Sequence, residues 1–303
     1  MYYDLIMVVT FIDNQSIGCM LKSVINSNHN IQVLIILVNQ LDIPLTIDNP
    51  NENVHIKSIY PKCALSLSRA RNTAIKYIKR NKIKSYHVMF PDDDSTFDKT
   101  FFEVFTDVVK LNNSYVIAVH NTNTKDYYRP FKFQVNQRLK KSDFKAAISV
   151  NMIMAYESLF RIGEFDESLG VGTRFGSAED VDYYIRACSI TDFRFSSRIY
   201  NYHPSTNFLF NNTSFMKLLN RSILYSRGYM YVMFRHKLFW EAFNIVVRAL
   251  LASGYFLVKL QLKRSIVNFL AFFTRQAHFL YFIFNYKSIF GGYAEKTKKP
   301  CSQ

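Results

Sequence analysis

Residues 86–94 read Tyr-His-Val-Met-Phe-Pro-Asp-Asp-Asp, so an apolar stretch of strand character ends at a proline and three carboxylates follow. Three adjacent carboxylates repel one another unless a cation or a set of donors neutralises them, and a position behind a buried strand strengthens the repulsion. In extended backbone, side chains alternate between faces, so Asp92 and Asp94 can face one divalent ion while Asp93 points inward or caps. The competing interpretation is an acidic turn that caps a helix beginning after Asp98.

The chain before this stretch alternates between strand and helix patterns. Residues 5–12 and 33–38 are continuous apolar runs, typical of strands buried on both faces of a parallel sheet, and residues 54–59 form a third strand pattern. A helix is expected after the first strand, because apolar residues recur at helical spacing at Ile17, Leu21, Val24 and Ile25. A second helix is expected after the third strand, with Ser68 as its N-cap and an apolar face of Ala70, Ala74, Ile75 and Ile78. The order predicts an open α/β sheet, in which ligands bind beyond the carboxyl ends of strands.

The chain after the acidic stretch leads to a second acidic pair. Asp98 is expected to cap a helix with a buried stripe of Phe101, Phe102, Phe105, Val108 and Val109. Residues 120–145 are polar, basic and weakly periodic, which predicts a long surface excursion that could include a hairpin. Four of the nine glycines, Gly163, Gly170, Gly172 and Gly176, precede Glu179-Asp180 closely and indicate a loop. A helix is expected to begin at that pair, with Val181, Tyr184, Ile185 and Cys188 on one face.

The positive charge is concentrated in the last third of the chain. The 303 residues carry 38 Lys and Arg against 23 Asp and Glu, a formal net charge of +15. Residues 1–203 hold 24 basic and 21 acidic side chains, whereas residues 204–303 hold 14 basic and 2 acidic ones. With 49% hydrophobic residues, the chain is folded rather than disordered. We expect a near-neutral α/β domain over residues 1–205 and a basic, aromatic, α-helical region over residues 206–303.

The last third is expected to bind a membrane surface. Its pattern is rich in Phe, Leu and Tyr, and cations recur among the apolar residues at Arg248, Lys259, Lys263, Arg264, Arg275 and Lys287. Such a pattern is typical of helices that lie in the headgroup plane of an anionic membrane. Residues 265–286 are the longest nearly uncharged run, but an arginine at the centre of a span costs roughly 2.5–3.5 kcal/mol, so a spanning helix is the less favoured alternative.

The cysteines and the N-terminus predict a cytoplasmic protein. Cys19, Cys63, Cys188 and Cys301 are widely spaced and form no Cys-x-x-Cys pair, which predicts reduced thiols rather than a disulfide framework or a zinc site. The sequence enters a strand-like stretch with no basic segment or small-residue cleavage site before it, so no secretory signal is expected. Together with the basic last third, these features predict peripheral attachment to the cytoplasmic face of the cell membrane.

Four motifs in order resemble the family 2 glycosyltransferases, which have the GT-A fold. They are residues 5–10 (Leu-Ile-Met-Val-Val-Thr), 66–72 (Ser-Leu-Ser-Arg-Ala-Arg-Asn), 89–94, and 163–167 (Gly-Glu-Phe-Asp-Glu) leading to 176–180 (Gly-Ser-Ala-Glu-Asp). Each is weakly specific alone, but their order and spacing match the family over residues 1–205. The resemblance is to the bacterial surface-polysaccharide type. It implies a Rossmann-like open mixed sheet flanked by helices, and transfer of a sugar from a nucleotide-sugar to an acceptor.

The resemblance implies a metal site at the acidic turn. Asp92 and Asp94 fall on the family's Asp-x-Asp motif, which holds Mg²⁺ or Mn²⁺ against the diphosphate of a nucleotide-sugar, with Asp94 the expected direct ligand. His203 stands where similar enzymes often place a histidine ligand, and an imidazole can complete a manganese site made otherwise of oxygens. A solvated histidine at a domain edge is the alternative for His203.

The resemblance also implies a catalytic base. Asp180 falls on the carboxylate of the family's Glu-Asp motif, which takes a proton from the acceptor hydroxyl as that hydroxyl attacks the anomeric carbon. Inversion at that carbon is expected. Glu179 is the second candidate for the role. Acidic residues at a helix start also complement the helix dipole and cap free amides, which is the structural alternative for both residues.

The phosphates and the nucleoside of the donor are expected to bind residues that follow the first and third strands. Arg69, Arg71 and Asn72 open a helix, and helix N-termini with arginines suit phosphates, although a solvated basic face is the alternative for the arginines. Thr10 and Asp13 are expected to line the nucleoside pocket. Asp93 is expected beside the diphosphate.

The nucleobase and the acceptor are less well defined by the motifs. The family's base-reading acidic residue after the second strand is replaced by Val38-Asn39-Gln40, with Asp42 the nearest carboxylate, so recognition of uridine is inferred from the fold. The acceptor side is expected around Tyr127, Tyr128, Arg129 and residues 170–175. The expected partners are a nucleotide-sugar, a glycan or polyprenyl-diphosphate-linked acceptor, and an anionic membrane surface.

Other functions compete with glycosyl transfer. A metal-dependent phosphotransferase or hydrolase acting on nucleotide diphosphates would use the same carboxylates, and only the need for an acceptor separates it from a transferase. A nucleic-acid-binding protein fits the charge and the aromatic content, but the tail cations lie among apolar runs such as 245–251, which a soluble nucleic-acid platform would not expose. No nucleic acid is therefore expected as a partner. A catalytically silent scaffold would require all these carboxylates to be present by chance.

Overall fold

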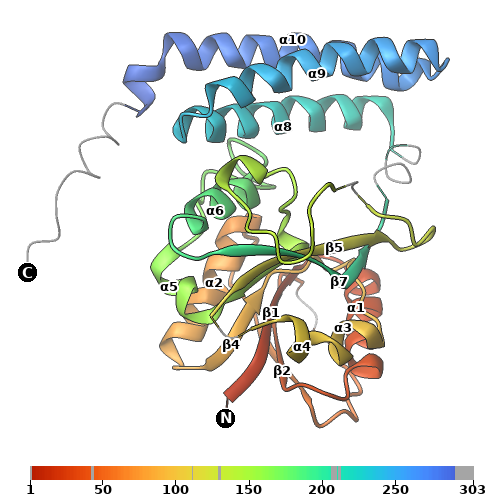
Figure 1. Cartoon of the computed structure of the whole chain (residues 1–303), viewed down its shortest axis with the longest axis vertical. Coiled ribbons are helices and arrows are strands. Elements are labelled where there is room, and N and C mark those ends of the chain that lie inside the picture. The colour runs from red at the N-terminus through yellow and green to blue at the C-terminus, as the bar shows by residue number, and fades with distance from the viewer. Residues whose placement is uncertain are drawn as a thin grey trace, which may run out of the picture. The chain divides into compact units, whose positions relative to one another are not determined.

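The computed structural model describes residues 2–41, 44–110, 112–128, 131–205, 210 and 213–290. The chain divides into two compact units (Figure 1). Met1–Glu167 and Glu179–Asn211 form what we call the sheet unit, and Ser168–Ala178 and Asn212–Gln303 form the helical unit. The composition predicts a boundary at residue 205, whereas the units divide after Asn211, and the sequence pattern gives no sign that Ser168–Ala178 groups with the helices.

The sheet unit is built on a seven-stranded sheet in the order β3-β2-β1-β4-β6-β5-β7. The strands are β1 (Tyr2–Phe11), β2 (Val33–Asn39), β3 (Val54–Ile59), β4 (Lys84–Met89), β5 (Ser114–Asn121), β6 (Met152–Ala155) and β7 (Phe193–His203). β6 is antiparallel to both of its neighbours, and the other pairs are parallel. The expected open mixed sheet is confirmed. Its strand order reverses between β1 and β4, which is where such sheets bind ligands.

Helices cover both faces of this sheet (Figure 1). One face carries α1 (Asn14–Ser27), α3 (Lys99–Glu103) and α4 (Phe105–Val108), and the other carries α2 (Leu67–Arg80), α5 (Tyr156–Ile162) and α6 (Glu179–Ala187). Leu5, Met7 and Val9 of β1 belong to the core under α1, and the side chains between them, such as Ile6, are equally buried. Because both faces are covered, residues 5–9 of β1 and 33–38 of β2 are continuous apolar runs rather than alternating ones.

The start of α2 differs from the sequence expectation. Ser66 is the residue that precedes the helix, and Ser68 lies inside its first turn, fully buried. Arg71 consequently lies beyond the first turn, where the helix has no free N–H groups to help bind a phosphate. The Arg71 side chain is 2% exposed. It therefore belongs neither to a solvated basic face nor to an open helix N-terminus, the two interpretations that the sequence suggests.

The expected cap at Asp98 is confirmed, although the helix behind it is shorter than expected. The Asp98 carboxylate accepts a hydrogen bond from the Phe101 N–H at 3.2 Å. The helix ends at Glu103, and a second short helix begins at Phe105. The stripe of buried side chains is nevertheless formed, because it continues across the two helices.

Within the described residues, the helical unit contains three long helices. They are α8 (Phe215–Arg235), α9 (Phe239–Val258) and α10 (Leu262–Phe284), as the helical pattern predicts. Ser168–Ala178 packs against α8, where the Phe175 and Tyr231 rings stack with centroids 4.1 Å apart. A Cβ at Gly228 would lie 2.5 Å from the Ser177 hydroxyl oxygen, so only glycine permits this close approach of helix and loop.

Three cysteines follow the sequence expectation. Cys19, Cys63 and Cys188 are free thiols. Asp42, Arg129 and Cys301, which the sequence analysis names, lie outside the described residues.

Candidate functional site

Two carboxylates and a histidine meet at the carboxyl ends of β4 and β7. Asp92 and Asp94 follow β4, and His203 is the last residue of β7. One potential ligand atom from each side chain lies within 4.8 Å of the others. His203 Nε2 is 3.3 Å from Asp94 Oδ1 and 3.7 Å from Asp92 Oδ2. We call these residues the triad. The two aspartates face the same point, as expected, but through a turn rather than through extended backbone, because the Ser95 N–H donates to the Asp92 carbonyl oxygen at 3.1 Å.

Backbone pairing brings His203 to the acidic turn. The Thr96 N–H donates to the Tyr202 carbonyl oxygen at 3.0 Å, and the Tyr202 N–H donates to the Thr96 carbonyl oxygen at 2.9 Å. The Tyr202 hydroxyl also donates to Asp98 Oδ2 at 2.9 Å. These contacts tie the exit of the acidic turn to the end of β7, so the triad depends on a tertiary contact.

The triad fits a divalent cation. Carboxylate oxygens and an imidazole nitrogen are ligands that Mn²⁺ accepts, and Mg²⁺ prefers the oxygens. His203 Nδ1 lies 3.0 Å from the Pro204 carbonyl oxygen, which favours a proton on Nδ1 and leaves Nε2 as a ligand atom. Asp94 Oδ1 is buried and accepts no hydrogen bond among the described residues when the proton of His203 is on Nδ1, because its neighbour at 3.3 Å is then the unprotonated Nε2. Burying such an oxygen without a partner is costly, and a cation would satisfy it.

The acidic turn carries more negative charge than its surroundings neutralise. Burial would raise the pKa of Asp92, but the His203 imidazole and the Arg71 guanidinium hold it below its usual range. Burial raises the pKa of Asp94, and burial together with the charges of Asp94 and Asp92 raises the pKa of Asp93 to about 6. Burial would lower the pKa of His203, but the two facing carboxylates raise it above its ordinary value. These opposed shifts are those expected of a site that attracts a cation.

A buried arginine links the acidic turn to the start of α6. Arg71 Nη2 is 3.1 Å from Asp92 Oδ1, and Arg71 Nη1 is 3.4 Å from Glu179 Oε1. The guanidinium carbon also lies 5.4 Å from the centre of the Phe165 ring. Arg71 therefore binds the protein's own carboxylates, in contrast to the direct phosphate contact expected from its place on the helix.

The two acidic residues at the start of α6 differ in their surroundings. Glu179 is 8% exposed, and burial with the charge of Asp180 raises the pKa of Glu179 to about 7, although Arg71 opposes the shift. Asp180 is partly exposed, and its Oδ1 accepts a hydrogen bond from the Val181 N–H at 2.8 Å. Asp180 is thus the more accessible carboxylate, although it also caps its own helix, as the structural alternative anticipates.

Arg69 and Asn72 both contact residues 165–167. Arg69 Nε is 3.4 Å from Glu167 Oε2. The Asn72 side-chain amide donates to the Phe165 carbonyl oxygen at 3.0 Å and to Glu167 at 3.2 Å, and Asn72 Oδ1 accepts from the Phe165 N–H at 2.8 Å. These bonds use both amide hydrogens of Asn72. Arg69 and Asn72 therefore support the loop before α6, and their expected contact with the donor stays a prediction.

Thr10 and Asp13 lie at the reversal of strand order. Thr10 is the second-last residue of β1 and is partly exposed. Asp13 is the N-cap of α1, where its carboxylate accepts hydrogen bonds from the N–H and the hydroxyl of Ser16 at 3.0 and 2.9 Å. Its charge contributes to the raised pKa of Asp93, so both acidic residues lie at the same edge of the sheet.

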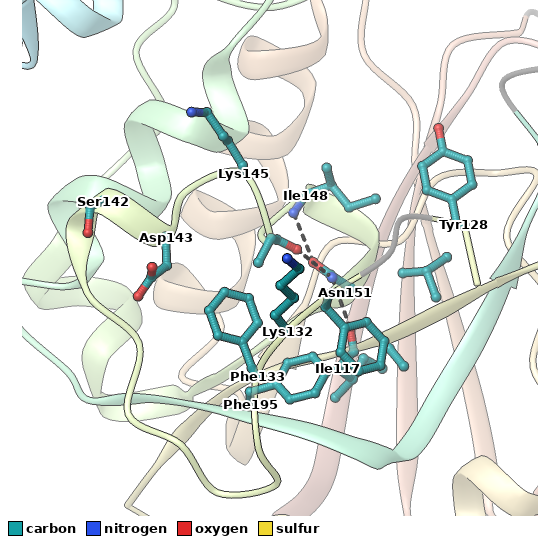
Figure 2. Close-up of a pocket in the computed structure, with 14 residues that line it drawn as sticks. Ile117, Tyr128, Lys132, Phe133, Ser142, Asp143, Lys145, Ile148, Asn151 and Phe195 are labelled. Atoms are coloured by element: carbon teal, nitrogen blue, oxygen red, sulfur yellow. Dashed lines mark hydrogen bonds between the residues drawn. The ribbon is translucent and has the colours of Figure 1, made fainter. Parts of the chain in front are cut away.

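A cavity of about 260 Å³ lies against β5 and β7 (Figure 2). Its lining comes from β5, from β7 and from the excursion after β5: Ile117, Ala118, Val119, Tyr128, Phe131, Lys132, Phe133, Ser142, Asp143, Lys145, Ala146, Ile148, Asn151 and Phe195. The Tyr128 ring centroid is 5.2 Å from that of His203. Ile148 precedes Ser149, whose hydroxyl donates to Asp92 Oδ1 at 3.4 Å. No motif identifies Ser149, because the surrounding sequence is weakly periodic.

No protein-family model and no curated protein sequence matches the chain. Among solved structures, S. aureus TarS 1–349 is similar, with a TM-score of 0.50 and 13% identity over 76% of this chain and 72% of that chain. TarS 1–349 in complex with UDP-GlcNAc and in complex with UDP are similar at a TM-score of 0.51 and 14% identity. These matches cover 74% of this chain and 65% and 64% of the TarS chains. Similarity at this identity establishes the fold, and the expected GT-A fold is confirmed.

Proposed function

We propose that this chain, with its GT-A fold, is a metal-dependent, inverting glycosyltransferase. It would move a hexose-type sugar from a nucleotide-sugar, a UDP-sugar by our inference, to a glycan or lipid-linked acceptor in the synthesis of a surface polysaccharide. The observation that carries the proposal is the convergence of Asp92, Asp94 and His203 at the carboxyl ends of the strands. The TarS complexes with UDP-GlcNAc and UDP support this class of donor.

Each residue of the site has a role in this proposal. Asp94, Asp92 and His203 hold Mn²⁺ or Mg²⁺, which when bound offsets the charge that builds on the departing diphosphate. Arg71 keeps Asp92 ionised and holds Glu179 beside it. Asp180 accepts the proton of the acceptor hydroxyl. The new bond from the acceptor oxygen to the anomeric carbon forms opposite the breaking bond to the diphosphate, so the configuration inverts.

Thr10, Asp13 and Asp93 complete the donor side of the proposal. Thr10 and Asp13 lie at the end of β1, where a nucleoside would bind in a sheet of this topology. Asp93 is the third carboxylate of the turn and lies close enough to Asp13 for the charge of Asp13 to raise its pKa.

Binding of nucleotides tests the proposal. UDP is expected to bind the wild-type chain in the presence of Mn²⁺ and to bind at least about tenfold more weakly without it, because the cation links the carboxylates to the diphosphate. Asp94→Ala is expected to lose the effect of Mn²⁺. The measurement is titration calorimetry with UDP, GDP and CDP, each with and without Mn²⁺.

Asp107→Ala is the matched control for this experiment. It removes an exposed carboxylate of α4 and should retain the metal effect. If none of the three nucleotides binds the wild type, the proposal is wrong. Consumption of UDP-sugar with water alone, at the same rate with and without acceptor, would favour the hydrolase.

We further propose that the helical unit attaches the protein to an anionic membrane surface. α10 carries an exposed apolar residue at every turn along one side: Leu262, Ile266, Phe269, Phe273, Ala277, Leu280 and Phe284. Arg275 does not interrupt this side, because its Nη1 donates to the Ile245 carbonyl oxygen of α9 at 3.1 Å. Lys259, Lys263 and Arg264 surround the turn between the two helices. Apolar insertion combined with cations is the pattern of interfacial helices.

Both α9 and α10 are long and apolar enough to cross a membrane, with a mean hydropathy of 1.4 and 1.2. Length and composition alone do not distinguish a spanning helix from one that lies in the interface. We place both helices in the interface because their cations recur among the apolar residues and because residues 204–303 carry 14 basic side chains against 2 acidic ones.

The only tryptophan of the chain reports on this attachment. Trp240 is in the first turn of α9 and is 70% exposed, so its emission should shift to shorter wavelength when vesicles containing anionic phosphatidylglycerol are added, and much less with phosphatidylcholine alone. Phe273→Asp should weaken vesicle binding about tenfold or more, because it loses an inserted ring and adds a repelled charge.

Tyr60→Asp is the matched control for the vesicle experiment. It changes an aromatic residue of the sheet unit that is 51% exposed, close to the 50% of Phe273, and should bind vesicles like the wild type. Equal binding by both variants would contradict the proposed face. Recovery of the protein from cell membranes only with detergent, and not with alkaline carbonate, would favour a spanning helix over interfacial attachment.

A further inference from the structure

The cavity beside the triad has an aromatic wall. The Phe131 and Phe133 rings lie 4.4 and 5.5 Å from the ring of Phe195, measured between centroids, and Tyr128 lines the side next to His203. Aromatic faces of this kind suit the apolar C–H face of a sugar ring, whose hydroxyls stay free for polar partners. A volume of about 260 Å³ lies just below the roughly 300–1,000 Å³ of sites for drug-sized ligands, so the cavity suits one sugar or polyol unit rather than a whole nucleotide-sugar.

The buried side-chain amide of Asn151 fixes one part of the cavity lining through hydrogen bonds. The Asn151 amide donates to the carbonyl oxygens of Ile117 and Ala146 at 2.9 and 3.0 Å, and Asn151 Oδ1 accepts from the Ile148 N–H at 2.8 Å (Figure 2). These bonds join the end of the excursion to β5. The wall is therefore formed before any ligand binds, which lowers the entropic cost of binding.

The excursion that forms this wall contains the positive charge of the first 203 residues. Residues 125–145 hold 7 basic and 2 acidic side chains. The remainder of residues 1–203 holds 17 basic and 19 acidic ones, so it would be slightly negative without the excursion. Figure 2 shows the Lys132 side chain extending among the lining residues, with Lys145 at the edge. A concentrated positive charge around an open cavity raises the local concentration of anions.

We infer that this cavity binds an anionic unit of the acceptor, a sugar or polyol that carries a phosphate or a carboxylate. The aromatic wall packs against the apolar face of the unit, and Lys132 binds its anionic group. The inference rests on the proposed function, because the contact between Tyr128 and His203 places the cavity next to the triad, where an acceptor must meet the donor.

The test uses three small probes and saturation-transfer NMR on the full chain. Glycerol 3-phosphate and methyl glucuronide carry the two possible anions, and methyl glucoside is the neutral comparison. At least one anionic probe is expected to bind about tenfold or more tightly than methyl glucoside, and which of the two binds distinguishes phosphate from carboxylate. Lys132→Ala should lower the affinity for that anionic probe about tenfold, and Phe131→Ala should lower the affinity for all three probes.

Lys141→Ala is the matched control, because Lys141 is an exposed lysine of the same excursion that does not line the cavity. The inference is overturned if no anionic probe binds, or if Lys132→Ala and Lys141→Ala weaken probe binding equally. It is also overturned if Phe131→Ala lowers the affinity for a UDP-sugar but not for UDP, because that result would assign the cavity to the donor sugar. UDP binding with Mn²⁺ is measured on the same samples. Its retention alongside a failed probe experiment overturns this inference alone, whereas its absence in the wild type overturns the proposed function.

Discussion

Replacing Asp180 with Asn is expected to lower the rate of glycosyl transfer by about 10²–10⁴-fold, the range that a positioned general base contributes. The amide has the shape of the carboxylate but cannot take the proton of the acceptor hydroxyl. Affinity for UDP and Mn²⁺ should stay unchanged, because the triad comes from the turn after β4 and the end of β7 rather than from α6. The measurement is incorporation of labelled sugar from the donor into acceptor, alongside calorimetry of UDP on the same protein.

Glu179→Gln is the informative comparison for Asp180→Asn. Glu179 is bonded to Arg71 and is nearly buried, so its replacement should affect transfer less than Asp180→Asn does. Full turnover in Asp180→Asn would exclude Asp180 as the base. If transfer then disappears in Glu179→Gln, the role belongs to Glu179.

Replacing Arg71 with Met is expected to destabilise the folded chain by about 3–5 kcal/mol, the usual cost of removing one partner from a buried ion pair. Methionine fills much of the space of the arginine stem, but it leaves Asp92 and Glu179 without their shared cation. The measurement is the midpoint of urea unfolding, followed by the signal of the sheet. The midpoint is compared rather than an extrapolated free energy, because a chain of two units need not unfold in one step.

The loss in Arg71→Met should depend on pH in a defined direction. Without the guanidinium, the pKa of Asp92 in the folded state should rise from its position below the usual range, and the pKa of Glu179, already raised to about 7, should rise further. A group with a raised folded pKa binds its proton more tightly in the folded state, so stability falls as pH rises through that range. The difference between variant and wild type should therefore be larger at pH 8 than at pH 5.

Arg69→Met is the matched control for Arg71→Met. Arg69 is on the same helix and also forms an ion pair, with Glu167, but its side chain is 59% exposed. Exposed pairs contribute about 0–1 kcal/mol, so the urea midpoint should barely move. Equal effects of the two substitutions would show that burial of the Arg71 network does not stabilise the fold as proposed.

The strands and helices of the sheet unit follow from local patterns. The apolar runs of β1 and β2 predict strands buried on both faces, and β3 has the bounds that its sequence predicts. Asp92 and Asp94 face one point as the spacing predicts, but the cause is a local turn, closed by the Ser95 N–H and the Asp92 carbonyl oxygen, and not the alternation of an extended backbone. The cap at Asp98 is equally local, since its carboxylate bonds an N–H three residues along.

The contacts that complete the site depend on the tertiary structure. The Thr96 and Tyr202 bridge brings His203 to the acidic turn, and without the family resemblance nothing in the residues around His203 distinguishes it from a solvated histidine. The register of α2 turns Arg71 inward to Asp92, whereas Arg69, two positions earlier, stays on the surface.

The sequence by itself therefore determined the order of elements up to the acidic turn, the position of that turn at a strand end, and the presence of a basic helical region, whereas β5, β6 and α5 were not predicted. The predicted features follow from patterns with a period of two or 3.6 residues, which act over one element at a time. The tertiary structure decided which side chains meet: the triad, the buried Arg71 network and the cavity lined by Phe131 and Lys132. Each of these joins segments that are distant in the chain, and packing between elements, rather than the preference of any one element, sets their distances.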